Sequence, residues 1–326
     1  MSQMLPPNPS GGPDLPDPTD EAAVELTKDA GKARNTRGTS LWGDAFRRLR
    51  KNPVAIAGAI IVLLFVLVAI LAPILAPYPG DALPGREYIT PTHIPGPGEL
   101  PQFPLGLDKF GGDELSKLIW GAQASLTIGV VSTIFGLAGG MLLGALAGGF
   151  GGWVESVIMR FVDIMLSIPS LLLAVSIAAI LGQTPMAVMI AIGVAQVPIF
   201  ARLLRSSMIS QRSSEYVLAA RSLGLSRGTI AVDHMLPNSM GPVIVQATLT
   251  LATAVIDAAA LSFLGLGGGR PETAEWGRML TYAQDSLAIA PQLAFFPGLC
   301  IAITALGFTL FGESLREALD PKSRTK

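Results

Sequence analysis

The sequence predicts an all-α membrane protein with six transmembrane helices and an amphipathic N-terminal arm. Half of its 326 residues are hydrophobic and only 14% are charged, which is typical of a membrane protein. The apolar residues form long runs instead of recurring at amphipathic spacing. A helix needs about 20 such residues to cross a hydrocarbon layer of roughly 30 Å, and several runs reach that length.

The charge and the cysteine content of the chain argue against nucleic-acid binding and against a metal site. A formal net charge of −1 leaves no basic domain to collect phosphates, which argues against a nucleic-acid partner. The single cysteine, Cys300, lies in an apolar run and cannot form an intrachain disulfide or a four-ligand metal site. His93 and His234 are far apart in the sequence, so no metal site is expected.

The N-terminal region divides into two parts. Residues 1–39 are rich in proline and glycine and lack apolar periodicity, which predicts a disordered cytoplasmic arm. Residues 40–52 are predicted to form an amphipathic helix at the membrane interface. Its apolar residues recur at helical spacing and its basic residues are suited to anionic lipids: Leu41, Trp42, Phe46 and Leu49, and Arg47, Arg48, Arg50 and Lys51.

Uncharged runs predict the first two transmembrane helices. The first is expected over 53–77 and the second over 120–150. Between them, residues 78–117 are predicted to be an extracytoplasmic loop, ordered or semi-ordered, without a core of its own. In the second helix glycine recurs every fourth residue, which allows another backbone to approach one face closely. These glycines are Gly136, Gly140, Gly144 and Gly148.

The remaining four helices follow from longer runs. Residues 164–201 are uncharged, and one helix of that length would measure about 57 Å, too long for a single crossing. The Gly182–Pro185 segment divides the run, which predicts a third helix over 154–181 and a fourth over 186–205. The fifth is expected over 239–264 and the sixth over 289–312, before a cytoplasmic tail at 314–326.

The distribution of basic residues predicts the orientation. With six crossings and the N-terminus inside, 18 lysines and arginines lie on the inner side and 5 on the outer side. Basic residues are enriched in cytoplasmic loops, so both termini and the loop between the fourth and fifth helices are expected in the cytoplasm.

That loop contains a polar segment, residues 213–238, which we call the elbow segment. Ser213 or Ser214 is expected to cap a short helix that runs to Leu223, and Gly224 to end it in a left-handed conformation. Ser226 is then expected to cap a second short helix that ends before Pro237. The pattern predicts two short helices that meet at an angle on the cytoplasmic side.

The spacing of small residues in the elbow segment resembles the EAA loop of ABC importer permeases. The matching residues are Ala219, Ala220, Gly224, Leu236 and Pro237. Further motifs are similar to the dipeptide/oligopeptide branch, in its C-type (DppC/OppC-like) subunit: Glu215-Tyr216, Pro237-Asn238, the run from Leu261 to Gly267, Pro271, and Glu275-Trp276-Gly277. Two positions depart from the pattern: Leu218 replaces the loop's name-giving Glu, and His234 replaces an Ile.

The resemblance implies a type I ABC importer permease core over residues 118–313, with a coupling loop at 206–238. It implies that the coupling loop docks on a separate ATPase subunit through Glu215, Tyr216, Ala219, Ala220, Arg221, Gly224, Leu236 and Pro237. Tyr216, Val217, Ala220 and Leu223 are expected to form one apolar stripe there, edged by Arg212, Arg221 and Arg227. Helix-in-groove docking is the expected mode.

The family's partners are a homologous second permease, two ATPase domains or subunits, and an extracytoplasmic peptide-binding protein that meets the loops at 78–117 and 266–288. The chain has no Gly-x-x-x-x-Gly-Lys-[Ser/Thr] phosphate loop. ATP and Mg are therefore expected on the ATPases, with no cofactor on this non-catalytic chain. The expected location is a bacterial cytoplasmic membrane.

Two helices carry polar residues on one face. In the fifth, the residues are Gln246, Thr250, Thr253 and Asp257, and in the third they are Arg160, Asp163, Ser167 and Ser170. Ionisable groups in a membrane helix must face protein or water. For the fifth helix we favour a translocation path, and for the third helix interhelical hydrogen bonds with an Arg160–Asp163 ion pair, although a path along Asp163 and Ser167 stays open.

Three alternatives remain at this point. The cargo of such a permease could be a nickel chelate or glutathione instead of a di- or oligopeptide. A secondary transporter driven by an ion gradient is less favoured because the sequence shows no duplicated halves. A membrane anchor without a path of its own would tolerate bulky apolar residues at Thr250, Thr253 and Asp257.

Overall fold

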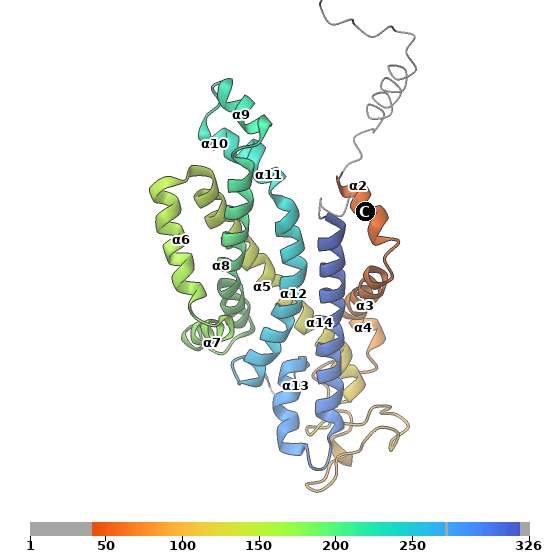
Figure 1. Cartoon of the computed structure of the whole chain (residues 1–326). Helices are drawn as coiled ribbons and strands as arrows, with labels where there is room; N and C mark the ends of the chain where they lie inside the picture. The colour runs from red at the N-terminus through yellow and green to blue at the C-terminus, as the bar shows by residue number, and fades with distance from the viewer. Residues whose placement is uncertain (1–40, 271–272, 320–326) are drawn as a thin grey trace, which may run out of the picture.

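The computed structural model describes residues 41–270 and 273–319. The predicted arm at 1–39, Pro271 and the last residues of the predicted tail lie outside the described residues. Within the described ranges the chain is helical and its extended pairing is limited to three isolated bridges. Figure 1 shows the helices gathered into one elongated bundle.

The helices fall into long membrane-type helices and short connecting ones. The long helices are α3 (Pro53–Ile70), α5 (Glu114–Phe150), α8 (Pro185–Gln211), α12 (Met240–Phe263) and α14 (Gln292–Leu319). The shorter ones are α2 (Leu41–Leu49), α4 (Ala72–Leu75), η1 (Arg86–Tyr88), α6 (Gly152–Leu166), α7 (Ser170–Leu181), α9 (Glu215–Ser222), α10 (Arg227–Thr229), the π-helical η2 (Ile230–Met235), α11 (Leu236–Asn238), α13 (Trp276–Ala283) and η3 (Gln284–Ser286).

The predicted third transmembrane helix is a bent pair instead of one straight helix. Five helices are long and apolar enough to cross a membrane, and α6 with α7 makes the sixth apolar unit, bent by 92°. The bend follows from Pro169, which has no N–H to donate and disfavours helical backbone at Ile168 before it. The expected helix over 154–181 therefore divides into α6 and α7, while the six-helix membrane fold class is confirmed.

A helix cap and a proline explain two other differences between the observed helices and the predicted ranges. Helix α5 begins at Glu114, before the expected 120, because the Asp113 carboxylate caps it by accepting a hydrogen bond from the Ser116 N–H at 2.9 Å. The first transmembrane helix ends early: α3 stops at Ile70, and Pro73 lies in the first turn of the separate helix α4.

The glycine stripe of α5 packs against α8. A Cβ at Gly140 would lie 2.8 Å from the Val197 carbonyl oxygen, and one at Gly144 would lie 2.8 Å from that of Ala201. Such distances leave no room for a side chain, so the two backbones touch. The stripe was predicted to bring another helix close, and the structure confirms this and identifies α8 as that helix.

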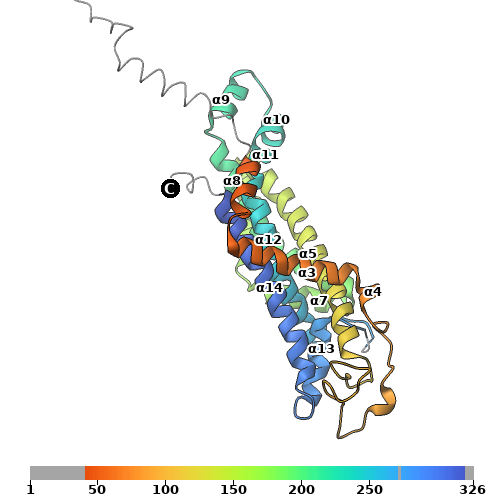
Figure 2. The same cartoon turned by 90° about the vertical axis from the view of Figure 1, so that its right-hand side faces the viewer.

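Two apolar cores share α5 and α12. One lies between these helices, α7 and α8, and includes Val188, Ile192 and Leu261; the other lies between them, α3, α13 and α14, and includes Val255 and Trp276. Figure 2 shows α3 crossing the bundle obliquely beside α14. A Cβ at Gly58 of α3 would lie 2.6 Å from a backbone nitrogen of α14, so this crossing is also a close one.

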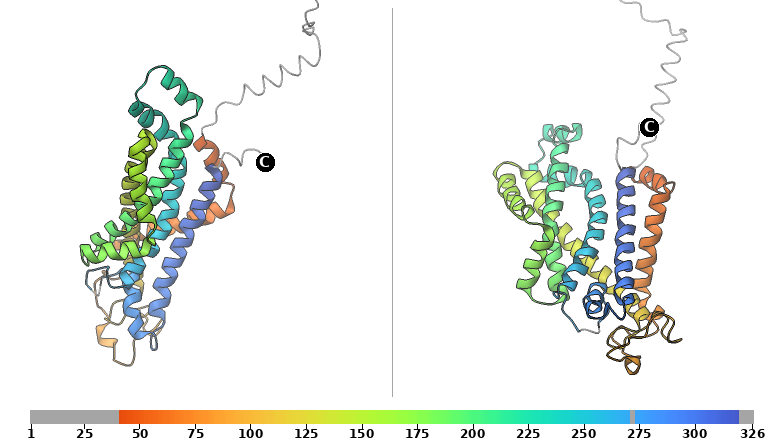
Figure 3. Two further views of the ribbon diagram at one scale, coloured as in Figure 1. Left: turned by 60° about the vertical axis from the view of Figure 1, so that its left-hand side comes forward. Right: turned by 60° about the horizontal axis from the view of Figure 1, so that its bottom comes forward.

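The two ends of the bundle differ in character. Helices α9 and α10, α2 and the end of α14 lie at one end, whereas residues 78–113 and α13 lie at the other (Figures 1 and 3). Because the chain crosses the bundle an even number of times, with α6 and α7 counted as one crossing, α2 and the C-terminal end of α14 lie at the same end.

The segment 78–113 is an ordered cap that packs on the bundle. Phe103 and Leu107 are buried in it, and Lys117 of α5 forms a buried ion pair with Asp108. Lys109 reaches across to Asp285 beyond α13, at 2.6 Å. The cap is thus tied to both the start of α5 and the loop after α13, which agrees with the ordered cap expected from the sequence.

Trp276 attaches α13 to α5 at the same end. Its indole N–H donates to the Leu118 carbonyl oxygen at 3.0 Å, and its backbone N–H donates to Ser125 Oγ at 3.2 Å. The side chain is fully buried, so burial and hydrogen bonds act together. Burial raises the pKa of the adjacent Glu275 carboxyl, whose oxygens accept from the backbone N–H groups of Gly277 and Arg278.

The α5–α8 contact yields a direct test. Gly140→Ala should destabilise the protein by about 1–3 kcal/mol because the added methyl overlaps α8. Gly241→Ala in α12 is the matched control, since nothing lies within 4 Å of a Cβ there. A fall in apparent Tm of the purified protein in detergent for the first variant alone is expected, and equal Tm values for both would contradict the close contact.

Candidate functional site

The elbow segment begins with a helix that ends at a glycine. Helix α9 is followed by Gly224 with φ of 78°, a left-handed conformation that glycine adopts without steric cost. The Leu225 N–H donates to the Ala220 carbonyl at 3.2 Å, and the Gly224 N–H donates to that of Arg221 at 2.9 Å. This pair of hydrogen bonds is the Schellman motif, so the expected left-handed stop is present.

The second half of the elbow segment continues through its proline. Ser226 caps α10 by accepting from the Thr229 N–H at 3.2 Å, as expected. The expected end before Pro237 is wrong, because helical backbone continues through η2 and α11 toward α12. Pro237 lies in the first turn of α11, where its missing N–H is tolerated. The wide π-turn of η2 directly precedes it.

The apolar residues of the elbow segment are divided between two faces. Val217 and Ala220 are buried and pack with Met208 of α8, Ile230 and Met235. Exposed instead are Tyr216, Leu218, Leu223, Leu225 and Val232, with Leu223 81% exposed. The single stripe expected from Tyr216, Val217, Ala220 and Leu223 is therefore wrong. The bundle covers Val217 and Ala220, which lie three apart on one face of α9, whereas Leu223 follows the last residue of that helix.

The other residues singled out in the elbow segment take clear positions. Exposed are Glu215, Tyr216, Ala219, Arg221, Gly224 and Pro237, whereas Ala220 is buried and Leu236 is half-buried. Leu218, at the position of the missing Glu, is 48% exposed. The outer surface of the elbow segment thus combines large apolar side chains with Glu215, Arg221 and Arg227.

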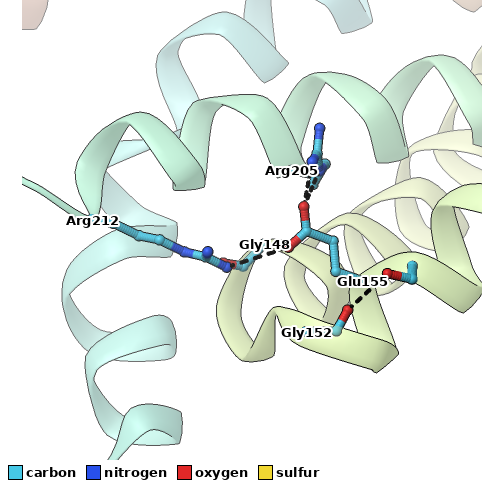
Figure 4. A network of polar contacts seen from close by, with 6 residues as sticks. Gly148, Gly152, Glu155, Arg205 and Arg212 are labelled. Atoms are coloured by element: carbon cyan, nitrogen blue, oxygen red, sulfur yellow. Dashed lines mark hydrogen bonds and ion pairs between the residues drawn. The ribbon is translucent and has the colours of Figure 1, made fainter.

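Arg212 does not edge that surface as expected. It is the C-cap of α8, and its guanidinium donates to the Gly148 carbonyl oxygen of α5 at 2.8 Å. It also lies 3.9 Å from the Glu155 carboxylate of α6, which accepts from Arg205 Nε at 2.9 Å. Figure 4 shows both arginines reaching from α8 toward Gly148 and Glu155.

Sequence reasoning assigned no role to Glu155 and Arg205. The signal was present, because each lies at the edge of an otherwise apolar run. Their pairing required the packing of α6 against α8.

On α6, the polar residues make contacts different from those expected. Asp163 pairs with Arg202 of α8 at 2.6 Å, with both side chains about half exposed, so the expected Arg160–Asp163 pair is replaced by an interhelical one. Ser167 donates to the Ile164 carbonyl at 2.6 Å. Both residues lie on the partly exposed flank of α6, next to the bend.

On α12, only some of the side chains on the polar face have a hydrogen-bond partner. Gln246 donates to Thr250 Oγ1 at 3.2 Å, and Thr253 Oγ1 donates to the Thr250 carbonyl at 2.9 Å. Thr250 is buried, Thr253 is exposed and Asp257 is half-buried. Within the described residues, neither an ion pair nor a hydrogen bond is recorded for the Asp257 side chain. A carboxylate in mid-helix requires water or another protein surface beside it.

The described residues show no cluster of three or more histidine, cysteine, aspartate or glutamate side chains suited to a metal ion.

Family comparisons cover most of the chain. Residues 140–325 match the model of the binding-protein-dependent transport system inner membrane component, and residues 40–91 match that of the N-terminal TM domain of oligopeptide transport permease C.

Individual relatives are similar over nearly their whole length. The chain is 43% identical to the dipeptide transport system permease protein DppC of Alkalihalophilus pseudofirmus, over 88% of this chain and 91% of that protein. Identity is also 43% to the di/tripeptide permease DppC of Pseudomonas aeruginosa, over 83% and 89%. It is 37% to the glutathione permease GsiD of Pectobacterium atrosepticum, over 87% and 92%.

A solved structure supports the fold. A chain of the MetNI methionine ABC transporter, in an inward-facing conformation, superposes with a TM-score of 0.52 at 20% identity, covering 63% of this chain and 96% of that one. At this identity the likeness concerns the fold alone.

Proposed function

The chain belongs to the family of binding-protein-dependent transport system inner membrane components, and from that premise we propose a specific role for it. It is the permease subunit of an ATP-driven importer that moves di- or oligopeptides delivered by an extracytoplasmic binding protein. The observation that carries the proposal is the elbow segment, a rigid projection with an exposed apolar face at one end of a membrane bundle.

The cargo assignment rests on relatives. Two relatives named for dipeptide or di/tripeptide transport are 43% identical to this chain over the aligned residues, and relatives named for glutathione transport are 37% or 40% identical. A peptide is therefore the favoured cargo, with glutathione or a nickel chelate as the alternative.

The elbow segment supplies a docking surface for a separate ATPase. Leu218, Leu223 and Leu225 are exposed on it, and Glu215 and Arg221 provide polar contacts at its edge. A short helix that presents large apolar side chains fits a groove on a partner. ATP and Mg belong to that partner, and closure of two ATPase domains on ATP would displace the elbow segment.

Displacement of the elbow segment would move α8 and α12 together. Its inner face packs with Met208 of α8 and Val243 of α12 in one cluster. Packed cores transmit movement because they deform little. On α12 the movement would reach Thr253 and Asp257, which we assign to the translocation path at an interface with a homologous second permease.

The orientation follows from the charge distribution. The end with the elbow segment and α2 holds the excess of basic residues and belongs in the cytoplasm. The cap at 78–113 and α13 then face the binding protein outside. These assignments place both termini on the inner side of a bacterial cytoplasmic membrane.

Co-purification tests the proposal as a whole. The tagged full-length chain should bring down one similar permease, two ATPase domains and a receptor, and mass spectrometry of the receptor's ligand should find peptides. A chain that moves cargo alone in proteoliposomes would contradict the assignment.

Gly224 tests the docking surface. A Cβ at Gly224 would meet nothing within 4 Å, although the positive φ strains a side chain there, so Gly224→Trp projects a ring into the proposed interface and adds local strain in the turn. Peptide uptake should fall about tenfold or more, which corresponds to about 1.4 kcal/mol of lost docking. Gly224→Asn is the control, because asparagine tolerates positive φ and is small. Wild-type uptake by an assembled Gly224→Trp complex would refute docking at this surface.

Asp257 tests the path. Asp257→Leu removes the charge, replaces the carboxylate with a larger apolar group of the same branching, and should lower uptake several-fold while ATPase binding persists. Ile256→Leu, one residue earlier and 48% exposed, is the control and should leave uptake unchanged. If Asp257→Leu imports peptide normally, the path runs elsewhere and the anchoring alternative gains support.

A further inference from the structure

Glu155 occupies a junction between three helices. It lies in the first turn of α6, and its carboxylate is mostly buried, with 18% of the side chain exposed. Arg205 of α8 contacts Oε1 through two nitrogens, Nε at 2.9 Å and Nη2. Arg212 approaches the other oxygen, Oε2, at 3.9 Å and is itself bonded to the end of α5 (Figure 4).

The backbone near this junction is built for close approach. Gly151 and Gly152, between α5 and α6, have φ of 71° and 59°, which glycine adopts readily. A Cβ at Gly151 would lie 3.0 Å from the Arg212 guanidinium. The turn that begins α6 therefore fits directly against the last residue of α8, and the elbow segment starts at the next residue.

Arg205 and Arg212 depend on one carboxylate. They are seven residues apart on α8, which is two helical turns, so they project from the same face. Glu155 lies between them and is the only acidic side chain of the described residues that the structure pairs with either. Its removal would leave two guanidinium groups side by side and partly buried, without a counter-charge.

Helix α6 has little else to hold it. Val162 is its single buried side chain, while Trp153, Val157 and Phe161 are more than half exposed. Its polar attachments to α8 are the Glu155 junction and the Asp163–Arg202 pair, which is more than half exposed. Exposed ion pairs contribute little. The Glu155 junction is thus the principal polar attachment between α6 and the base of the elbow segment.

We propose that Glu155 is a positioning residue that makes α6, and with it the bent helix α7, follow the elbow segment when the ATPases displace it. This inference rests on the proposed function. Leu218 stands where the EAA pattern has Glu, and Glu155 of α6 supplies a carboxylate to Arg205 and Arg212, directly before the elbow segment.

The test uses the complete complex, with second permease, ATPases and receptor, in proteoliposomes. Glu155→Gln should retain assembly and basal ATP hydrolysis, and uptake per ATP hydrolysed should fall about tenfold, within the usual range of coupling between sites. Glu155→Asp, which keeps the charge, should recover part of the uptake. Glu313→Gln, which breaks the exposed Glu313–Arg316 pair within α14, is the control and should stay within about twofold of the unmodified complex.

A distance measurement separates positioning from simple stabilisation. Spin labels are placed at Val157 on α6 and at Ser213, the first residue of the elbow segment, in a Cys300→Ser background, because Cys300 is the only cysteine. A second pair joins Ser213 to the exposed Leu306 of α14. In the unmodified complex, nucleotide should change the second distance and leave the first nearly constant. In Glu155→Gln the first distance should change as well, because α6 no longer follows.

A double variant and the behaviour of the unmodified complex distinguish the remaining outcomes. If Glu155→Gln fails to assemble, Glu155→Gln combined with Arg205→Met removes one of the two unpaired charges, while Arg212 keeps its hydrogen bond to the Gly148 carbonyl oxygen, and this double variant should also lose coupled uptake. Uptake and distances like those of the unmodified complex, in whichever variant assembles, would overturn the role of Glu155. Absence of ATP-driven uptake in the unmodified complex would instead refute the proposed function, and the inference with it.

Discussion

The contact between α5 and α8 is the constraint on which the rest of the structure depends. Glycines at every fourth position of α5 let the two backbones touch along several turns. Because α8 leads into the elbow segment, this contact sets where the projection stands. Arg212, at the end of α8, then bonds to the last turn of α5, so the helix pair is closed by a polar contact where the apolar packing stops.

The helices of the bundle differ in how many of their side chains are buried. Helices α5 and α12 contribute to both apolar cores, and α8 packs with them in one of the two. Helix α6 is peripheral, with one buried side chain, and Pro169 separates its direction from that of α7. A helix of this kind moves at low cost unless polar contacts restrain it. The Glu155 junction lies at the base of the elbow segment, which is why we propose that α6 moves with it.

The end of the bundle that carries α13 and the cap is stabilised by hydrogen bonds and ion pairs. Trp276, the first residue of α13, packs against α5, and both of its N–H groups donate hydrogen bonds to α5. Buried or partly buried charges attach the cap to α5 and to the residues after α13. These contacts make the cap an ordered surface, which supports the proposed docking of a binding protein there. The two ends are joined through α5 and α12, which run the length of the bundle.

The sequence alone determined the helical membrane fold, the glycine face of α5, the Gly224 stop and the Ser226 cap. Each of these depends on residues close together in the chain: apolar runs, four-residue spacing, or a single left-handed turn. Tertiary structure decided the rest. The burial of Val217 and Ala220 depends on the bundle beneath α9. The pairing of Glu155 with Arg205, and of Asp163 with Arg202, joins residues about 40 to 50 positions apart. Charge partners at such separations are chosen by the helix packing that brings them together, which local sequence patterns do not encode.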